Sequence, residues 1–179
     1  MSEKDDKKHV VREQGLTYDD YAALDDGKRY ELVDGQLELM SPSPSTIHQL
    51  VSFELQKKID EPCRNEYIIF NAPIDLILST KEMRQPDLVL VHRNRLNIVS
   101  RKGIEGVPDL VVEILSPSTL KRDKLDKLKT YAHFHIPEYW IVEPELGSLE
   151  QFVLKNDPTL KKGEYKLINI YQGDESVTS

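Results

Sequence analysis

The chain has 179 residues but only one cysteine and one tryptophan, and aromatic residues make up 7% of it. The single thiol, Cys63, excludes an intramolecular disulfide and a cysteine-rich zinc site. No apolar run approaches the length of a membrane-spanning helix, and the charged first residues do not resemble a secretory signal. We therefore expect a cytoplasmic protein without a membrane segment.

Recognisable cofactor motifs are also missing. The sequence contains neither a phosphate-binding loop nor a dinucleotide fingerprint, so no organic cofactor is expected. The net charge of -7 argues against a protein that coats nucleic acid by bulk electrostatics. It does not exclude a nuclease, because an acidic pocket is what holds catalytic metal ions.

The composition that is present describes an ordinary folded protein. Hydrophobic residues make up 39% of the chain and charged residues 31%, which suits one domain with a sizeable core. Residues 1–13 and 173–179 are polar and poor in hydrophobic side chains, so we expect both to be disordered tails. Residues 14–172 show no repeat or linker and are predicted to form a single domain.

The apolar periodicity predicts an α/β fold of mixed α+β type. Three helices are expected, capped by Thr17, by Ser45 or Thr46, and by Ser118 or Thr119. The second of them has apolar residues at helical spacing, namely Ile47, Leu50, Val51 and Leu55. Strands are expected within residues 30–39, 66–80, 84–92, 108–115, 137–145, 149–155 and 164–171, the last two as an antiparallel pair.

A hairpin is the clearest local signal. Asp34-Gly35 between two apolar segments favours a two-residue turn, which places Glu31 opposite Glu38. Like charges directly opposite each other are unfavourable. Either the pair lies on a wet face near the preceding basic residues, or Glu31 points into a site that requires negative charge.

One charge interrupts an apolar strand. Glu113 is flanked by Val112 and Ile114 without polar alternation, which is typical of a strand covered on both faces. A carboxylate there requires a cation or hydrogen-bond donors. If the strand that follows Asp87 is its neighbour, the two carboxylates can converge on one divalent cation, Mg²⁺ or Mn²⁺. Such an ion polarises a phosphodiester and lowers the pKa of an attacking water.

Five blocks of sequence carry a family resemblance when taken together. They read RYELVDGQLELMSPSPSTIHQ, QPDLVLV, PDLVVEILSPST, RDKLDKLKTY and IPEYWIVEP. They resemble the Uma2 family, also described as domain of unknown function 820, of the PD-(D/E)XK restriction-endonuclease-like superfamily. The resemblance implies a mixed central β-sheet flanked by helices, with an N-terminal β-hairpin, and metal-dependent cleavage of DNA. It implies that Asp87 and Glu113 bind the metal together with the main-chain carbonyl of Ile114.

One superfamily feature is displaced. A lysine is expected two residues after the glutamate, where this chain has Leu115. The family block RDxxxKxxxY reads here as Arg122, Asp123, Lys127 and Tyr131, and a helix starting near the end of the glutamate strand can bring its side chains to the site. We therefore predict that Lys127 assists the attacking water. Without the resemblance, a lysine-rich amphipathic helix is most often a solvated surface.

Two further residues match the family blocks. Glu31 and His48 are therefore predicted to face the same pocket. The chain also departs from the family pattern, with His135 where glycine is common and Glu143 where aspartate is usual. Both departures lie away from the proposed metal ligands.

Two other functions stay open at this level. One is a catalytically silent module of the same fold that binds nucleic acid or protein, with a homodimer as one form it could take. The other is a hydrolase that acts on RNA or on another phosphate ester. A rise in melting temperature with divalent metal would separate a metal site from a dry scaffold.

Overall fold

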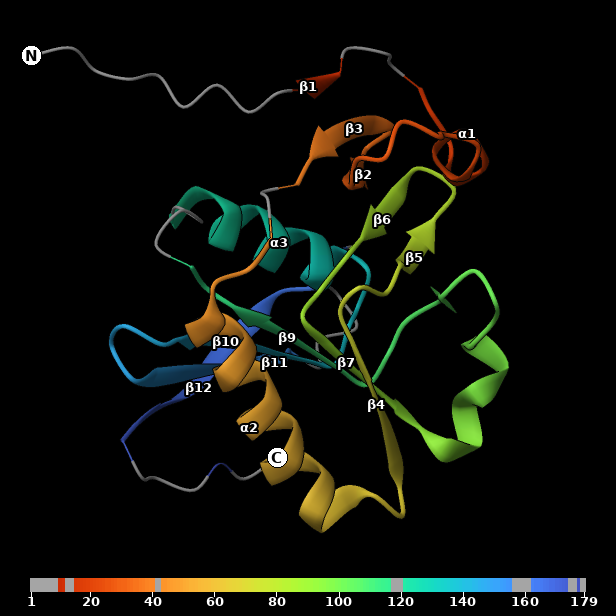
Figure 1. Cartoon of the computed structure of the whole chain (residues 1–179). Helices are drawn as coiled ribbons and strands as arrows, with labels where there is room; N and C mark the ends of the chain where they lie inside the picture. The colour runs from red at the N-terminus through yellow and green to blue at the C-terminus, as the bar shows by residue number, and fades with distance from the viewer. Residues whose placement is uncertain are drawn as a thin grey trace, which may run out of the picture.

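Two six-stranded mixed sheets and three α-helices make up the fold (Figure 1). The computed structural model describes residues 10–11, 15–40, 43–116, 121–155, 162–173 and 177, with only the main chain for 10–11 and 121–124. The helices are α1 (Tyr18–Ala22), α2 (Thr46–Cys63) and α3 (Lys121–His133), and η1 (Arg93–Ile98) is a 3₁₀ segment. Among the described helices, none is both long and apolar enough to cross a bilayer.

The predicted hairpin belongs to the first sheet. The strand order is β1-β3-β2-β6-β5-β8, with β1 Val10–Val11, β2 Tyr30–Val33, β3 Gln36–Leu39, β5 Leu76–Ser79, β6 Glu82–Arg84 and β8 Ile104–Glu105. Asp34 and Gly35 have φ angles of 48° and 73°, as a two-residue hairpin turn requires. The register confirms that Glu31 lies opposite Glu38. The strand β1 lies inside the predicted 1–13 tail, most of which is outside the described residues.

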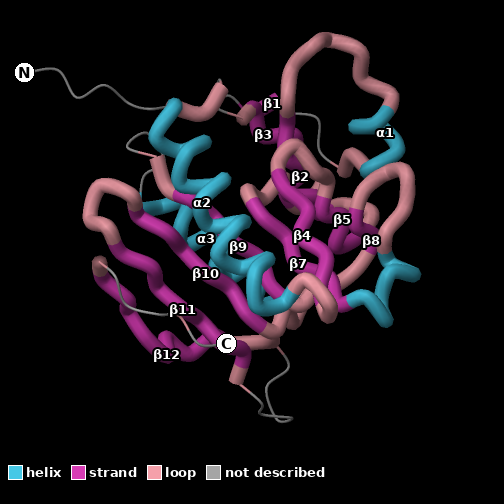
Figure 2. Tube along the Cα trace, turned by 60° about the horizontal axis from the view of Figure 1, so that its bottom comes forward, coloured by secondary structure: helices cyan, strands magenta, loops and turns pink. Residues whose placement is uncertain are grey.

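The second sheet contains the two strands that were expected to carry metal ligands (Figure 2). Its order is β12-β11-β10-β9-β7-β4, with β4 Tyr67–Asn71, β7 Leu88–His92, β9 Leu110–Ile114, β10 Glu138–Glu143, β11 Ser148–Leu154 and β12 Tyr165–Gln172. The predicted antiparallel C-terminal pair is β11 with β12. Residues 156–161 of the connection between them lie outside the described residues. The expected caps of the third helix, Ser118 and Thr119, lie outside them as well.

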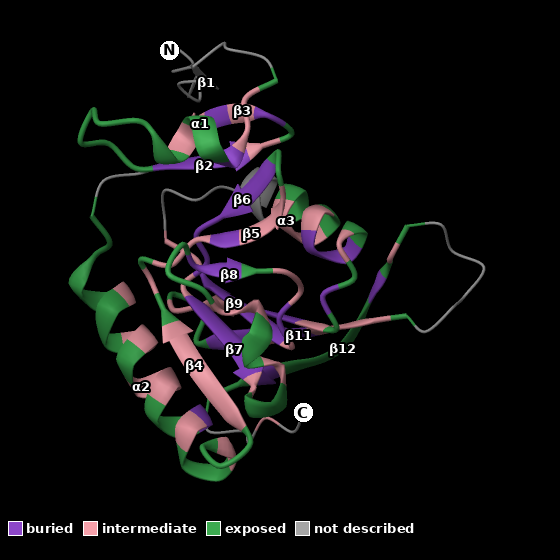
Figure 3. Ribbon diagram, turned by 90° about the vertical axis from the view of Figure 1, so that its right-hand side faces the viewer, coloured by how far each residue is buried: buried purple, intermediate pink, exposed green. Residues whose placement is uncertain are grey.

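Both faces of the second sheet are covered at β9, which confirms the interpretation of the apolar strand around Glu113. Every residue of β9 is buried (Figure 3). On one face, Leu88 and Val112 pack against Ile59 of α2. On the other, Val89 and Val111 share a core with α3 and the first sheet. Glu113 follows Val111 by two residues, so its side chain points toward α3.

Helix α2 is only partly packed against the sheet. Ser45 caps it and accepts a hydrogen bond from the His48 amide at 3.2 Å, and Leu55 and Ile59 reach the core. Ile47 and Leu50, which have apolar helical spacing, are 63% and 62% exposed. The first half of the helix borders a pocket rather than the core, so its apolar periodicity does not mark a buried face there.

Residues 82 and 83, between the predicted strands 66–80 and 84–92, belong to a further, buried strand. β6 inserts Glu82, Met83 and Arg84 between β2 and β5. The apolar segment 66–80 breaks at Pro73, as predicted, but its halves β4 and β5 enter different sheets.

The turn after α3 explains one departure from the family pattern. His135 adopts a φ of 59°, and its amide donates to the carbonyl of Ala132 at 3.0 Å. This left-handed conformation is most easily adopted by glycine, the residue common in the family at this place. The histidine thus affects a helix end and leaves the pocket unchanged.

Candidate functional site

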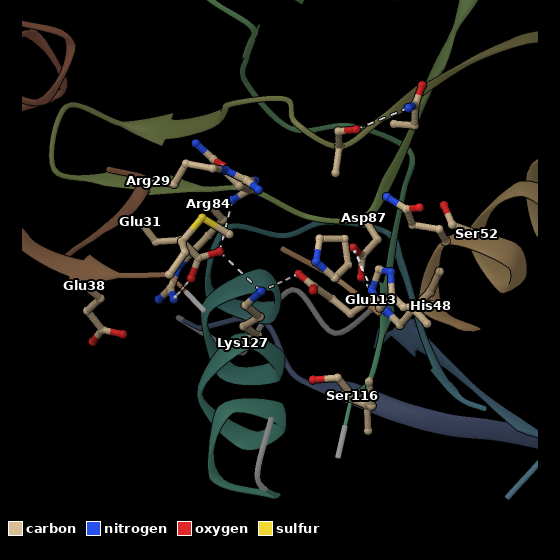
Figure 4. A pocket seen from close by; sticks show the side chains of 18 of the residues that line it. Arg29, Glu31, Glu38, His48, Ser52, Arg84, Asp87, Glu113, Ser116 and Lys127 are labelled. Carbon is tan, nitrogen blue, oxygen red and sulfur yellow. Dashed lines mark hydrogen bonds and ion pairs between the residues drawn. The ribbon is translucent and has the colours of Figure 1, made fainter. Parts of the chain in front are cut away.

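A pocket of about 490 Å³ lies where α2, α3 and the two sheets meet (Figure 4). All the residues predicted for the site line it, namely Glu31, His48, Asp87, Glu113, Ile114 and Lys127. They come from β2, α2, the start of β7, β9 and α3, so the pocket depends on elements from most of the chain.

The two predicted carboxylate ligands meet because their strands are antiparallel neighbours. Leu88 of β7 pairs with Val112 of β9, so the next positions along the ladder bring Asp87 beside Glu113. Asp87 Oδ2 accepts a hydrogen bond from the Ile114 amide at 2.7 Å, and its Oδ1 lies 3.1 Å from Nε2 of His48. The hydrogen bond to Asp87 raises the pKa of His48 despite partial burial.

Asp109, which follows Pro108 as Asp87 follows Pro86, has a structural role. Since β7 and β9 run in opposite directions, Asp109 starts its strand at the far end from the pocket. Its carboxylate accepts from the His92 amide at 2.7 Å and from Arg95 Nη1 at 2.6 Å.

Helix α3 brings Lys127 to the carboxylates, where the sequence predicted it. Its Nζ lies 2.9 Å from Glu113 Oε1 and 3.3 Å from Glu31 Oε1. One turn further along α3, the Tyr131 hydroxyl donates to the same Glu113 oxygen at 2.7 Å. Burial opposes the charge of Lys127, but the two carboxylates outweigh it and raise the pKa of the ammonium, which stays protonated.

A second buried cation, Arg84, was not predicted. It is 3% exposed, its Nε donates to Glu82 at 2.7 Å, and its Nη1 lies 3.3 Å from Glu31 Oε2. Its Nη2 donates to the Thr130 hydroxyl at 3.1 Å, which joins β6 to α3. The alternation of Glu82 and Arg84 around an apolar Met83 is the sequence signal that could have revealed a strand here.

Among the residues whose side chains are described, the buried charges do not balance. Three carboxylates, Glu31, Glu82 and Glu113, share the two cations Arg84 and Lys127, and Asp87 adds further negative charge beside Glu113. Burial alone would raise the pKa of Glu31, but Lys127 and Arg84 lower it to about 2. Burial raises the pKa of Glu113 to about 7, and the charges of Asp87 and Glu31 add to this against the attraction of Lys127. Glu113 is therefore the carboxylate whose ionised form is least compensated.

This imbalance predicts a characteristic dependence of stability on pH. Between pH 4.5 and about 7 the folded protein retains a proton on Glu113 that the unfolded chain has released, so its free energy of unfolding should fall as pH rises. At roughly 1.4 kcal/mol per unit, the total is about 3 kcal/mol. Glu31 acts in the opposite direction at lower pH, where stability is lost as pH falls from 4.5 to about 2.

Urea unfolding in EDTA at a series of pH values measures the effect, with Glu113→Gln as the reference that lacks the titrating group. Saturating Mg²⁺ should abolish the decline in the wild type, because a bound cation favours the ionised carboxylate. Equal slopes for wild type and variant in EDTA would contradict the assignment.

At the pocket rim, Arg29 offers a different kind of cation. It is exposed, and its Nε and Nη2 donate at 3.1 and 2.6 Å to the side-chain oxygen of Gln85, a neutral partner. The buried Gln85 also donates its main-chain amide to Glu31 at 3.1 Å. Gln85 thus holds Arg29 in place without neutralising its positive charge.

The donor set fits a hard divalent cation with few protein ligands. Within the described part of the chain, no three side chains of His, Cys, Asp or Glu are grouped to hold an ion. Mg²⁺ commonly takes one or two carboxylates and fills its remaining positions with water and substrate oxygens. Two acidic oxygen donors with surplus negative charge, beside an open pocket, match that requirement.

The chain has a mixed α+β fold of restriction-endonuclease-like type, with two mixed sheets, three α-helices and an acidic pocket where the sheets, α2 and α3 meet. The chain belongs to the Uma2 family, whose model, described as "Putative restriction endonuclease", matches residues 17–179. A solved structure from Anabaena variabilis ATCC 29413, described as "a putative nuclease belonging to DUF820", superposes with a TM-score of 0.69 at 14% identity. The alignment covers 92% of this chain and 88% of that one, so the two share the fold. No curated protein matches the chain.

Proposed function

We propose that this protein is an endonuclease that hydrolyses phosphodiester bonds in DNA with Mg²⁺ or Mn²⁺. Asp87, Glu113 and the carbonyl of Ile114 would hold the ion. When bound, it would polarise the phosphodiester and lower the pKa of the attacking water. The family description and the acidic pocket support a nuclease, while the ion and the DNA substrate are our inference.

The single observation that carries the proposal is the surplus carboxylate. Lys127 is shared by Glu31 and Glu113, and Arg84 is shared by Glu31 and Glu82, so the two described cations serve three carboxylates. A buried carboxylate without full compensation is costly unless a cation or hydrogen-bond donors meet it. A divalent cation supplies the missing charge at Glu113.

The protonation of Lys127 defines its role. An ammonium with a raised pKa does not act as a general base at neutral pH, so Lys127 would donate a hydrogen bond to the water or stabilise charge on the phosphate. Glu31 would fix the position of the ammonium through the contact of 3.3 Å.

Two other residues can act on the substrate directly. His48, whose pKa is raised by Asp87, can supply a proton to the departing oxygen. Arg29 retains a charge at the pocket rim that can bind a phosphate of the DNA strand.

The test is cleavage of supercoiled plasmid, linear duplex, single-stranded DNA and RNA by the full chain, with Mg²⁺, Mn²⁺ or EDTA. We expect cleavage of at least one DNA substrate that requires the metal. Melting temperatures under the same conditions show whether the metal binds the native state.

The combined outcomes separate the candidate functions. Cleavage of RNA alone would replace the DNA substrate in the proposal. A metal-dependent rise in melting temperature without cleavage of any substrate would favour the silent binding module, for which a homodimer stays a prediction. The absence of both cleavage and a thermal shift would contradict the metal site.

A further inference from the structure

The hydroxyl of Tyr139 is buried without a hydrogen-bond partner. It is the one buried side-chain nitrogen or oxygen for which the described structure offers neither a partner nor solvent. Other buried tyrosines are satisfied, since Tyr131 donates to Glu113 at 2.7 Å and Tyr165 to the Ile136 carbonyl at 2.8 Å. A phenylalanine would fill the same space and avoid burying an unpaired polar atom, which destabilises a protein. The hydroxyl therefore requires an explanation.

Its position points to Glu113. Tyr139 of β10 pairs with Val111 of the parallel strand β9, and Glu113 lies two residues further on the same face. The Tyr139 side chain also lines the pocket. Its ring lies edge-on to that of Tyr131, with 5.0 Å between the centroids, so the two tyrosines flank the same carboxylate.

The hydrogen bonds of Glu113 are one-sided. Lys127 and Tyr131 both donate to Oε1. Among the described residues no donor is found for Oε2, which borders the pocket, whereas the Tyr139 hydroxyl on the same face lacks both a partner and solvent. A rotation of the Glu113 side chain toward Tyr139 would give this hydroxyl an acceptor.

We infer that Tyr139 is a positioning residue whose hydroxyl donates a hydrogen bond to Glu113 when that carboxylate is bound to the divalent cation. This inference rests on the proposed metal-dependent function. It assigns the two tyrosines different states of the site. Lys127 and Tyr131 hold Glu113 in the arrangement described here, and Tyr139 would hold it when the ion is bound. Partners of this kind fix the orientation of a ligand and increase metal affinity.

A matched pair of variants, Tyr139→Phe and Tyr131→Phe, tests the assignment. Melting temperatures in EDTA report the metal-free state, and calorimetric titration with Mn²⁺ reports the bound state without requiring activity. Tyr139→Phe should melt at or above the wild-type temperature in EDTA yet bind Mn²⁺ about 10- to 100-fold more weakly. Tyr131→Phe should melt below the wild type in EDTA, because it loses an existing hydrogen bond.

Each contrary result has a distinct meaning. Equal Mn²⁺ affinity for Tyr139→Phe and the wild type would overturn the inference and leave the proposed function intact. A lower melting temperature of Tyr139→Phe in EDTA would show that the hydroxyl already has a structural partner, which also overturns it. A wild type that does not bind Mn²⁺ would overturn the metal-dependent function and the inference together.

Discussion

Replacing Glu113 with glutamine should reduce Mg²⁺-dependent DNA cleavage by about 10³-fold or more while the domain stays folded. A catalytic cation contributes several kcal/mol of transition-state stabilisation, and each 1.36 kcal/mol corresponds to a tenfold change in rate. Glutamine has the same shape but no charge, so it weakens ion binding at the carboxylate whose charge is least compensated. The fold should tolerate the change, because a buried charge without full compensation is removed.

Single-turnover cleavage of the best substrate, measured beside circular dichroism, provides the readout. Glu38→Gln is the matched control, because Glu38 lines the same pocket and lies opposite Glu31 in the hairpin but is not a proposed ligand. It should retain activity within a few-fold. Comparable losses in Glu113→Gln and Glu38→Gln would indicate that the pocket depends on general negative charge and not on a specific ligand.

Lys127→Met should have the second large effect, and on two properties at once. Loss of a group that assists the attacking water reduces the rate by about 10²- to 10⁴-fold. Loss of the ammonium also leaves Glu31 and Glu113 buried with less compensation, which should lower the free energy of unfolding by about 3–5 kcal/mol.

A double variant separates the catalytic effect from the structural one. Glu31→Gln combined with Lys127→Met removes one negative charge with the positive one, so it should regain much of the lost stability but none of the lost activity. Stability comes from urea unfolding and activity from the same single-turnover assay, with the single Glu31→Gln variant as the reference. Recovery of cleavage in the double variant would assign Lys127 a purely structural role.

The local elements of this fold could be predicted because their signals are local. The Asp34-Gly35 turn, the Thr17 and Ser45 caps and the apolar strand of Glu113 each depend on a few neighbouring residues. The division of the strands between two sheets could not be predicted, because nothing on either side of Pro73 indicates which partner β4 or β5 will pair with. Long-range pairing is decided by packing over the whole chain.

The residues of the site were likewise predicted only in part. The family blocks identified the residues that the structure brings together, including Lys127 in place of a lysine at Leu115. They did not identify Arg84, because a strand with two charged residues is buried only when a partner such as Glu31 arrives from elsewhere in the chain. The unpaired hydroxyl of Tyr139 could not be predicted either, since it depends on the orientation of neighbouring side chains in the folded structure.

The contact between Glu31 and Lys127 also has a consequence for how the protein is made. These residues are far apart in the chain. Glu31 lies on β2 of the first sheet and Lys127 on α3, and the two elements line the pocket from different sides. Contacts of such long sequence separation form late, because the intervening chain must first be closed into a loop. During synthesis the pocket cannot be complete until α3 has left the ribosome and docked against the hairpin. A nuclease built in this way has no working site in its unfinished chains.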